Sequence, residues 1–336
     1  MLTAVRVNEQ SQVAGARREA LAQANRLGFG EEHAGRVALV ATELATNLVK
    51  HVRGGGEMLA GIYEDATGSG VELFSLDRGA GMANLVRNVQ DGYSTTGSPG
   101  TGLGAVIRLS ETSEVWSRPG RGTAVLARCS ARRRRGAASS AVPAWGGIAV
   151  SKAGEEVCGD AWCVGDGAGA RTLMVADGLG HGPDAAVASH EALRIFRKRA
   201  GEAPAAMLEA MHAGLRGTRG AAVSVARIDP DRKVVVFAGV GNVGGALVSG
   251  DQMRRMVSHN GTVGHVARRF QEFEYPYGDG SLVVLTSDGI ASGWTLDRYA
   301  GVTQVHPSLI AALIYRDFAR GRDDATVLVG KPAGLT

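Results

Sequence analysis

The chain has 336 residues, of which 44% are hydrophobic and 21% charged, and its formal net charge is +4. This is the composition of ordinary globular proteins, and the length suffices for about two domains. No run of about 18 apolar residues exists, so we expect no membrane span. Four of the 37 basic residues form one run at 132–135, and the remainder balance the 33 acidic residues, which disfavours a nucleic-acid-binding protein. With no secretion signal and three cysteines lacking metal-site spacing, we expect a cytoplasmic protein.

The stretch ARRRRGAASSAVPA at 131–144 is the clearest change in composition along the chain. It joins a run of arginines to small residues and a proline, which is typical of a solvated linker. Contact of the arginines with an anionic surface is the alternative. We therefore predict one domain over 1–130, a linker over 131–144 and a second domain over 145–332.

Periodicity predicts helices and strands in both parts of the chain. Before the linker, helices are expected at 11–28, 31–51 and 101–110, and strands at 70–77 and 122–128. After the linker, strands are expected at 171–177, 221–228, 233–240, 245–250, 281–288 and 325–330, and helices at 182–200, 204–216 and 307–321. Strand runs between helix pairs favour α/β domains in which helices cover the sheets.

Polar residues of the first domain stand where a cleft could form. Glu43, Asn47 and His51 share one face of their predicted helix, beside an apolar stripe, where they either line a cleft or form a solvated edge. Asp77 ends a predicted strand in DRGAGM. It is either an acceptor for an amino group or the first residue of a simple turn.

The stretch DGYSTTGSPGTGLGA at 91–105 places glycines and hydroxyls just before a predicted helix. Glycine lets backbone N–H groups approach a ligand closely, and a helix N-terminus attracts anions, so phosphate is the expected ligand. The P-loop ending Gly-Lys-Ser/Thr is missing, which excludes that class of site.

The order of these signals resembles the GHKL (Bergerat-fold) ATP-binding family, and within it the small serine kinases of the RsbW/RsbT type. TELATNLVKH, DRGAGM and the glycine-rich stretch look closest to the RsbT branch, and the resemblance covers nearly all of 1–130. It implies a Bergerat-fold α/β sandwich that binds ATP with Mg²⁺. It also implies that Asn47 holds Mg²⁺ against the triphosphate and that Glu43 takes the proton from a protein hydroxyl.

The same resemblance implies how the nucleotide is held. Asp77 would accept a hydrogen bond from the adenine amino group, with help from Thr123. Glycines would shape the adenine turn (Gly79 and Gly81) and hold the phosphates (Gly100, Gly102 and Gly104).

Acidic residues of the second domain fall at the ends of predicted strands or in loops: Asp160, Asp177, Asp288, Asp323 and Asp324. One Asp-Gly pair is usually a turn, but clustered carboxylates need compensating cations, and Mg²⁺ and Mn²⁺ prefer oxygen ligands. The glycines after Asp177 and Asp288 are expected to let the backbone come close to such a metal.

ADGLGHG and SDGI…RDDAT resemble the metal-dependent Ser/Thr phosphatases of the type-2C superfamily, in the SpoIIE branch and most like RsbX. The match covers about 145–332 and implies an α/β/β/α sandwich with two Mn²⁺ or Mg²⁺ ions. Asp177 would bridge both metals, with the Gly178 carbonyl as a further ligand. Asp288 and Asp323 would complete one metal, and Asp160 would bind the other, through water or directly.

Other residues near these motifs have two interpretations each. His181 is either a proton donor or a helix-start residue. Asn242 and His259 either approach the substrate or belong to turns. A zinc pair of His259 with His265 lacks further ligands nearby.

Together the two resemblances imply a fused switch enzyme. The first domain would phosphorylate a STAS-domain antagonist protein, and the second would remove phosphate from the same or a related protein. In the main alternative the first domain only binds ATP and a partner, a STAS protein or a sigma factor, and the phosphatase is the sole enzyme. In a third, the phosphatase acts on its own chain at Ser94, Thr95, Thr96 or Ser139.

Overall fold

The computed structural model describes residues 1–65, 68–83, 102–130 and 145–332. Contacts divide the chain into two compact units, Leu2–Ser139 and Ser140–Thr336. Most of the predicted phosphate-binding stretch, including Gly100, lies outside the described residues. So do the predicted linker and the four hydroxyl residues named above. No helix among the described residues is long and apolar enough to cross a membrane.

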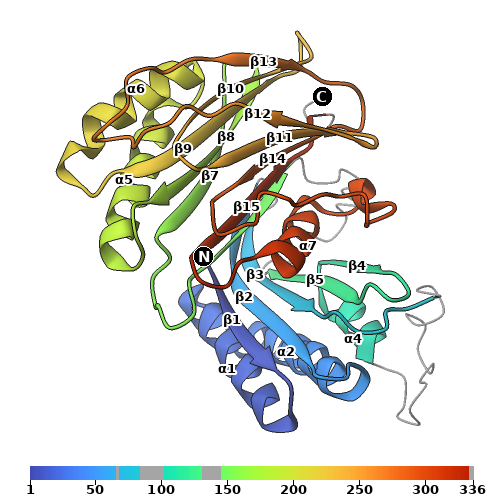
Figure 1. Ribbon diagram of the computed structural model, residues 1–336. Helices are drawn as coiled ribbons and strands as arrows, with labels where there is room; N and C mark the ends of the chain where they lie inside the picture. Colours follow the sequence, from blue (N-terminus) through green and yellow to red (C-terminus); the bar gives the residue numbers. More distant parts are fainter. Residues whose placement is uncertain (66–67, 84–101, 131–144, 333–336) are drawn as a thin grey trace. The chain divides into compact units, whose positions relative to one another are not determined.

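The N-terminal unit is an antiparallel sheet with helices on one face (Figure 1). In spatial order its strands are β1 (Leu2–Val7), β2 (Gly56–Asp65), β3 (Gly68–Leu76), β5 (Thr123–Ser130) and β4 (Thr112–Ser117). Its described helices are α1 (Gln10–Arg26), α2 (Glu31–His51) and α4 (Gly102–Leu109).

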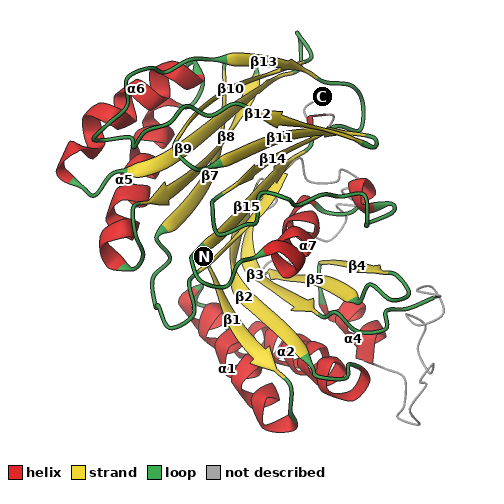
Figure 2. Ribbon diagram, viewed as in Figure 1, coloured by secondary structure: helices red, strands yellow, loops and turns green. Residues whose placement is uncertain are grey.

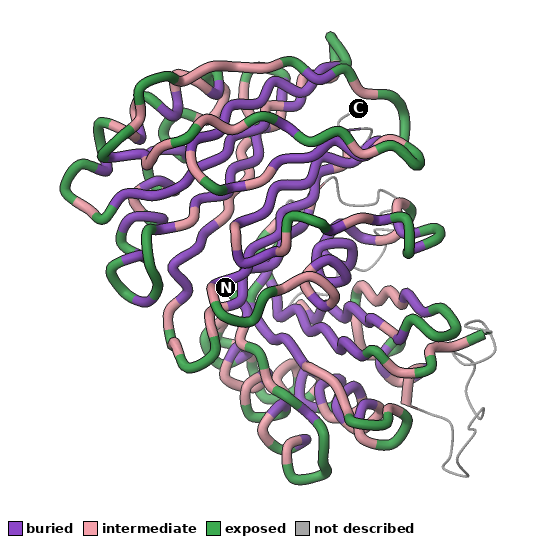
Figure 3. Tube along the Cα trace, viewed as in Figure 1, coloured by how far each residue is buried: buried purple, intermediate pink, exposed green. Residues whose placement is uncertain are grey.

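The core of this unit lies between the helices and the sheet (Figure 3). The predicted apolar stripe of α2 is buried there, because a spacing of three or four residues puts its members on one side of the helix. Its members are Val37, Val40, Leu44 and Leu48. They share the core with Val71 and Leu73 of β3 and with Val125 and Ala127 of β5. Glu43 and Asn47 border this stripe and are half-buried, as the helical spacing predicts.

The C-terminal unit contains two sheets. One has the order β13 (Phe273–Pro276), β10 (Val234–Val240), β9 (Ala221–Asp229), β8 (Ala170–Gly178) and β7 (Asp160–Gly167). The other has the order β12 (Gln252–Met256), β11 (Gly244–Ser249), β14 (Leu282–Thr286), β15 (Ala325–Gly330) and β6 (Trp145–Val150). The helices are α5 (Pro183–Arg199), α6 (Pro204–Gly214) and α7 (Pro307–Phe318), with short 3₁₀ turns η1 (Leu215–Gly217) and η2 (Val302–Gln304).

Alternation along β8 shows how the layers stack. Met174 and Ala176 point into a core shared with α5 and α6, whereas Leu173 and Val175 point into a core shared with the second sheet. Helix α7 packs on β6 and β15 of that second sheet. The layers are therefore helix, sheet, sheet and helix (Figure 2), which confirms the predicted α/β/β/α sandwich.

Candidate functional sites

The turn after β3 holds Asp77 in a fixed position. Its side chain is buried, and Oδ1 accepts the Gly79 N–H at 2.7 Å. Its own N–H donates to the Thr123 carbonyl at 2.9 Å, which ties the turn to the start of β5. A carboxylate held in this way at a strand end can accept a further hydrogen bond from a ligand amino group.

Two glycines let backbone segments meet around this turn. A Cβ on Gly81 would lie 1.9 Å from the Arg118 carbonyl oxygen, and one on Gly122 would lie 2.1 Å from the Asp77 carbonyl oxygen. Both glycines have positive φ, +68° and +71°, so no other residue fits either position without strain. Gly122 is absent from the predicted site residues. A glycine as the first residue of a predicted strand, at 122–128, is the one signal that could have indicated it.

Helices α2 and α4 bring three predicted residues together. A Cβ at Gly102 would lie 3.2 Å from Asn47 Oδ1 and 3.3 Å from Glu43 Oε2. A carboxylate and an amide oxygen therefore face the start of a helix, where free N–H groups favour an anion. This donor set fits a nucleotide phosphate with Mg²⁺. His51, on the same helix, is exposed.

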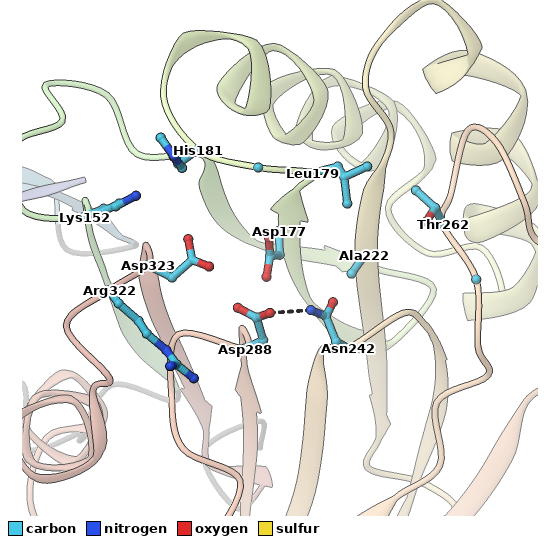
Figure 4. Close-up of a pocket in the computed structure, with 12 residues that line it drawn as sticks. Lys152, Asp177, Leu179, His181, Ala222, Asn242, Thr262, Asp288, Arg322 and Asp323 are labelled. Carbon is cyan, nitrogen blue, oxygen red and sulfur yellow. Dashed lines mark hydrogen bonds between the residues drawn. The ribbon is translucent and has the colours of Figure 1, made fainter.

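The C-terminal unit has a cavity of about 300 Å³ that opens over three aspartates (Figure 4). Asp177 comes from the end of β8, Asp288 from the loop after β14 and Asp323 from the loop before β15. The other lining residues are Lys152, Leu179, Gly180, His181, Ala222, Asn242, Gly261, Thr262 and Arg322. The structure thus brings Asp177 together with two carboxylates that lie more than a hundred residues further along the chain.

A fourth aspartate lies beside them, because Asp160 of β7 is paired directly opposite Asp177 of β8. Burial raises the pKa of Asp177, and with the added repulsion of Asp160 and Asp288 it reaches about 9. Burial also raises the pKa of Asp160 to about 7, although a hydrogen bond from Ser287 acts against this shift. Like charges directly across a strand pair repel, so these carboxylates need protons or cations to coexist.

The donor chemistry of the cluster fits hard divalent cations. One buried oxygen of Asp160, Oδ2, has no hydrogen-bond partner among the described residues. Burial raises the pKa of Asp288, as does the charge of Asp323. The side chains are not closed around one point: no group of three or more His, Cys, Asp or Glu in the described ranges has metal-binding geometry. The four aspartates supply carboxylate oxygens, which are the ligands that Mg²⁺ and Mn²⁺ prefer.

Asp324 has a supporting role that differs from that of its neighbour Asp323. Its Oδ1 accepts the Lys152 N–H at 2.7 Å, and its Oδ2 accepts the Gly159 N–H at 2.8 Å. These bonds fix the loop that leads into β7 and hence the position of Asp160. Asp324 is buried, so both bonds are shielded from water.

The glycines after Asp177 and Asp288 are required by packing. A Cβ on Gly178 would lie 2.0 Å from the Ala185 carbonyl oxygen of α5, and one on Gly289 would lie 1.8 Å from the Asp324 carbonyl oxygen. Both glycines were expected to let the backbone approach a metal. The structure adds a second reason, because each one lets two backbone segments meet behind the carboxylates.

His181 and Asn242 both line the cavity. His181 Nδ1 lies 2.7 Å from Glu155 Oε1, and Asn242 Nδ2 donates to Asp288 Oδ2. No sequence signal indicated the contact with Glu155, because the two residues belong to different loops.

The two remaining histidines of the sequence analysis point elsewhere. His259 stacks near Phe273 with ring centroids 5.9 Å apart, and His265 Nε2 lies 3.0 Å from the Thr218 carbonyl oxygen. His265 is thus held by a backbone carbonyl, whereas His259 Nε2 is buried and has no hydrogen-bond partner among the described residues.

The comparisons with known proteins agree with this geometry. Residues 7–129 match the family model described as histidine kinase-like ATPase domain. Over 123 residues the chain is 30% identical to the serine/threonine-protein kinase RsbT of Bacillus subtilis (strain 168), covering 37% of this chain and 92% of that protein. The chain belongs to the RsbT family. This confirms the resemblance found for the first domain.

The second half of the chain matches a different family model. Residues 167–332 match the model of stage II sporulation protein E (SpoIIE). A solved structure described as the bacterial stressosome, a modular system adapted to control secondary messenger signaling, is 29% identical, with a TM-score of 0.51, and the match covers 56% of this chain and 98% of that one. The PP2C phosphatase domain and regulatory fragment of Bacillus subtilis SpoIIE is 17% identical, with a TM-score of 0.47, covering 95% and 93%. This RsbT relative therefore joins a histidine kinase-like ATPase domain to a second domain that matches the SpoIIE family model.

Proposed function

We propose that the chain is a bifunctional partner-switching enzyme. Its N-terminal unit uses ATP to phosphorylate a serine or threonine of a STAS-domain antagonist protein. Its C-terminal unit hydrolyses that phosphate from the same or a related protein. The phosphorylation state of the partner then decides what it binds, such as a sigma factor or another downstream regulator.

The convergence of Glu43, Asn47 and Gly102 supports the kinase half. Phosphoryl transfer needs positioning and charge neutralisation more than covalent chemistry by the protein. Glu43 would accept the proton of the partner hydroxyl, and Asn47 would hold Mg²⁺ beside the phosphates. The other assigned residues bind the nucleotide: Asp77, Gly79, Gly81 and Thr123 at the adenine, and Gly100, Gly102 and Gly104 at the phosphates.

The observation that most strongly supports the phosphatase half is the cross-strand pair of Asp160 and Asp177. We assign Asp177, the Gly178 carbonyl, Asp288, Asp323 and Asp160 as the groups that hold two divalent cations. When bound, Mn²⁺ or Mg²⁺ would neutralise phosphate oxygens and lower the pKa of the attacking water. The chain's own contribution is to keep these carboxylates close together despite their repulsion, through the backbone packing of Gly178 and the hydrogen bonds of Asp324.

Phosphate release from a phosphorylated STAS-domain protein tests this assignment. With Mn²⁺, wild type should release phosphate, and Asp177→Asn should lose the activity by at least a hundredfold. Asp166→Asn is the matched control, because Asp166 lies on the same strand as Asp160 but points to solvent, where Arg171 Nε donates to it at 2.7 Å. Equal rates in wild type and Asp177→Asn would refute the assignment of the carboxylates.

A further inference from the structure

The cavity above the three aspartates has two chemically different sides (Figure 4). Lys152 and Arg322 lie on one side of the carboxylates and are called the basic wall here. Leu179, Ala222 and Thr262 lie on the other side and are called the apolar wall. A phosphorylated segment that crosses the cavity would therefore contact basic side chains on one side of its phosphate and apolar side chains on the other.

The basic wall lies close enough to the carboxylates for the charge of Arg322 to act against the rise that burial causes in the pKa of Asp288. Among the described residues, the structure records no ion pair for the side chain of Lys152 or Arg322. Some exposed arginines elsewhere in the unit do form ion pairs, as Arg232 does with Glu274 at 2.7 Å and Arg199 with Glu202 at 2.8 Å. The backbone N–H of Lys152 donates to Asp324, which fixes the backbone position of Lys152 at the rim of the cavity.

The apolar wall is exposed but held in place by its backbone. Leu179 is 56% exposed, and its N–H donates to the Gly220 carbonyl at 3.0 Å. The preceding Gly178 is locked against α5, so Leu179 cannot retreat into the core. A fixed apolar side chain can bind a partner with little loss of conformational freedom.

The loop beside Leu179 extends this wall. Thr262 N–H donates to the Val266 carbonyl at 2.7 Å, and Val266 N–H donates back to Thr262 at 3.0 Å. Val266 is 63% exposed. The Val263 N–H donates to Ala221 at 2.8 Å, which ties the loop to β9.

We propose that this cavity selects phosphoprotein segments by the residues on both sides of the phosphorylated side chain, with an acidic residue over the basic wall and an apolar residue over the apolar wall. The inference rests on the proposed phosphatase function and deepens it. The cavity floor is carboxylate, so cations held there would meet the phosphate itself. Lys152 and Arg322 at the rim are then left for an acidic neighbour of the phosphate, and Leu179 is left for an apolar one.

The test uses the full chain with Mn²⁺ and a set of phosphoserine peptides. Two peptides carry glutamates on one side of the phosphoserine and leucines on the other. In the first the glutamates lie on the N-terminal side, and in the second they lie on the C-terminal side. Two others replace either the glutamates or the leucines by alanine. In one direction, kcat/KM should fall about fivefold when the glutamates are removed and about tenfold when the leucines are removed.

Variants assign each preference to its wall. Lys152→Glu should reverse the charge preference, so that a lysine-flanked peptide is hydrolysed faster than the glutamate-flanked one. Leu179→Ser should abolish the preference for leucine. Lys198→Ala, at the far end of α5, and Val257→Ser, another exposed valine, are matched controls that should keep both preferences.

Three results would overturn the inference. The first is equal kcat/KM for all peptides, and the second is an unchanged charge preference in Lys152→Glu. The third is a loss of kcat/KM in that variant that is the same for every peptide, which would mean that Lys152 contacts the phosphate itself. Hydrolysis of p-nitrophenyl phosphate separates this failure from failure of the phosphatase assignment. A chain that hydrolyses this small ester but shows no peptide preference is a phosphatase without the proposed selectivity. A chain that hydrolyses neither substrate contradicts the proposed function as well.

Discussion

Replacing Asp160 by asparagine should stabilise the metal-free protein. Asp160 is buried opposite Asp177, and its ionised form is disfavoured in the fold. Asparagine has nearly the same shape and no charge, and its amide can donate to the neighbouring carboxylates. The substitution therefore removes the electrostatic repulsion between residue 160 and the Asp177 carboxylate.

The size and the sign of this effect follow from the pKa of Asp160. Burial raises it from the ordinary 3.8 to about 7, and each unit is worth about 1.4 kcal/mol, so the ionised side chain costs at most about 4 kcal/mol. Because the pKa is raised in the fold, the cost begins as pH rises above the unfolded value and is complete above the folded value. The gain from Asp160→Asn should thus be small near pH 4, grow between pH 5 and 7, and stay constant above that.

Thermal unfolding of the full chain in EDTA, at pH 5 and pH 8, measures this effect. At pH 8 the transition of the C-terminal unit should rise by up to about 10 °C, and at pH 5 by much less. Adding Mn²⁺ should stabilise wild type more than the variant. Asp166→Asn is the control that should change little at either pH. A lower transition in Asp160→Asn, or a gain independent of pH, would refute the reasoning.

Three further predictions concern the groups that hold the two sites. Asp324→Ala removes the acceptor of two buried backbone N–H bonds and should cost about 3 kcal/mol or more in unfolding free energy; an unchanged melting temperature would contradict this. Gly178→Ala should cost about 1–3 kcal/mol by overpacking. Gly293→Ala, where a Cβ has nothing within 4 Å, should stay within about 0.5 kcal/mol, and equal losses in urea unfolding would count against the packing argument. Asp77→Asn should weaken ATP binding at least tenfold in calorimetry while Mn²⁺-dependent hydrolysis continues, and an unchanged Kd would remove Asp77 from the adenine site.

Strong periodicity made much of the fold predictable. Helix α2 has the predicted bounds, and the β8, β9 and β10 strands lie where apolar β-branched runs indicated them. Strands with weak signals could not be predicted from the sequence. β12, QMRRM, has a single buried residue, and β7, DAWCVGDG, contains two aspartates and two glycines. Their place is set by pairing with neighbours, which no local pattern contains.

The sequence indicated which types of residue would gather at the candidate sites, but it said less about how they would be arranged. Asp177, Asp288 and Asp323 line one cavity, as the motifs implied. The opposition of Asp160 and Asp177 depends on the register of β7 against β8, because a slip of one residue would turn one carboxylate to the other face. The two walls of the cavity come from separate loops, so they could be recognised only once the strands had placed those loops.

Intact-mass measurement of a STAS-domain partner from the same organism tests the central claim most directly. The partner is incubated with ATP, Mg²⁺ and the Asp177→Ala chain, in which the phosphatase is silenced. The account predicts a gain of one phosphate, followed by its loss when wild-type chain and Mn²⁺ are added. If the partner gains no phosphate although the chain binds ATP, the N-terminal unit is a binding module and the claim of a two-way switch is contradicted.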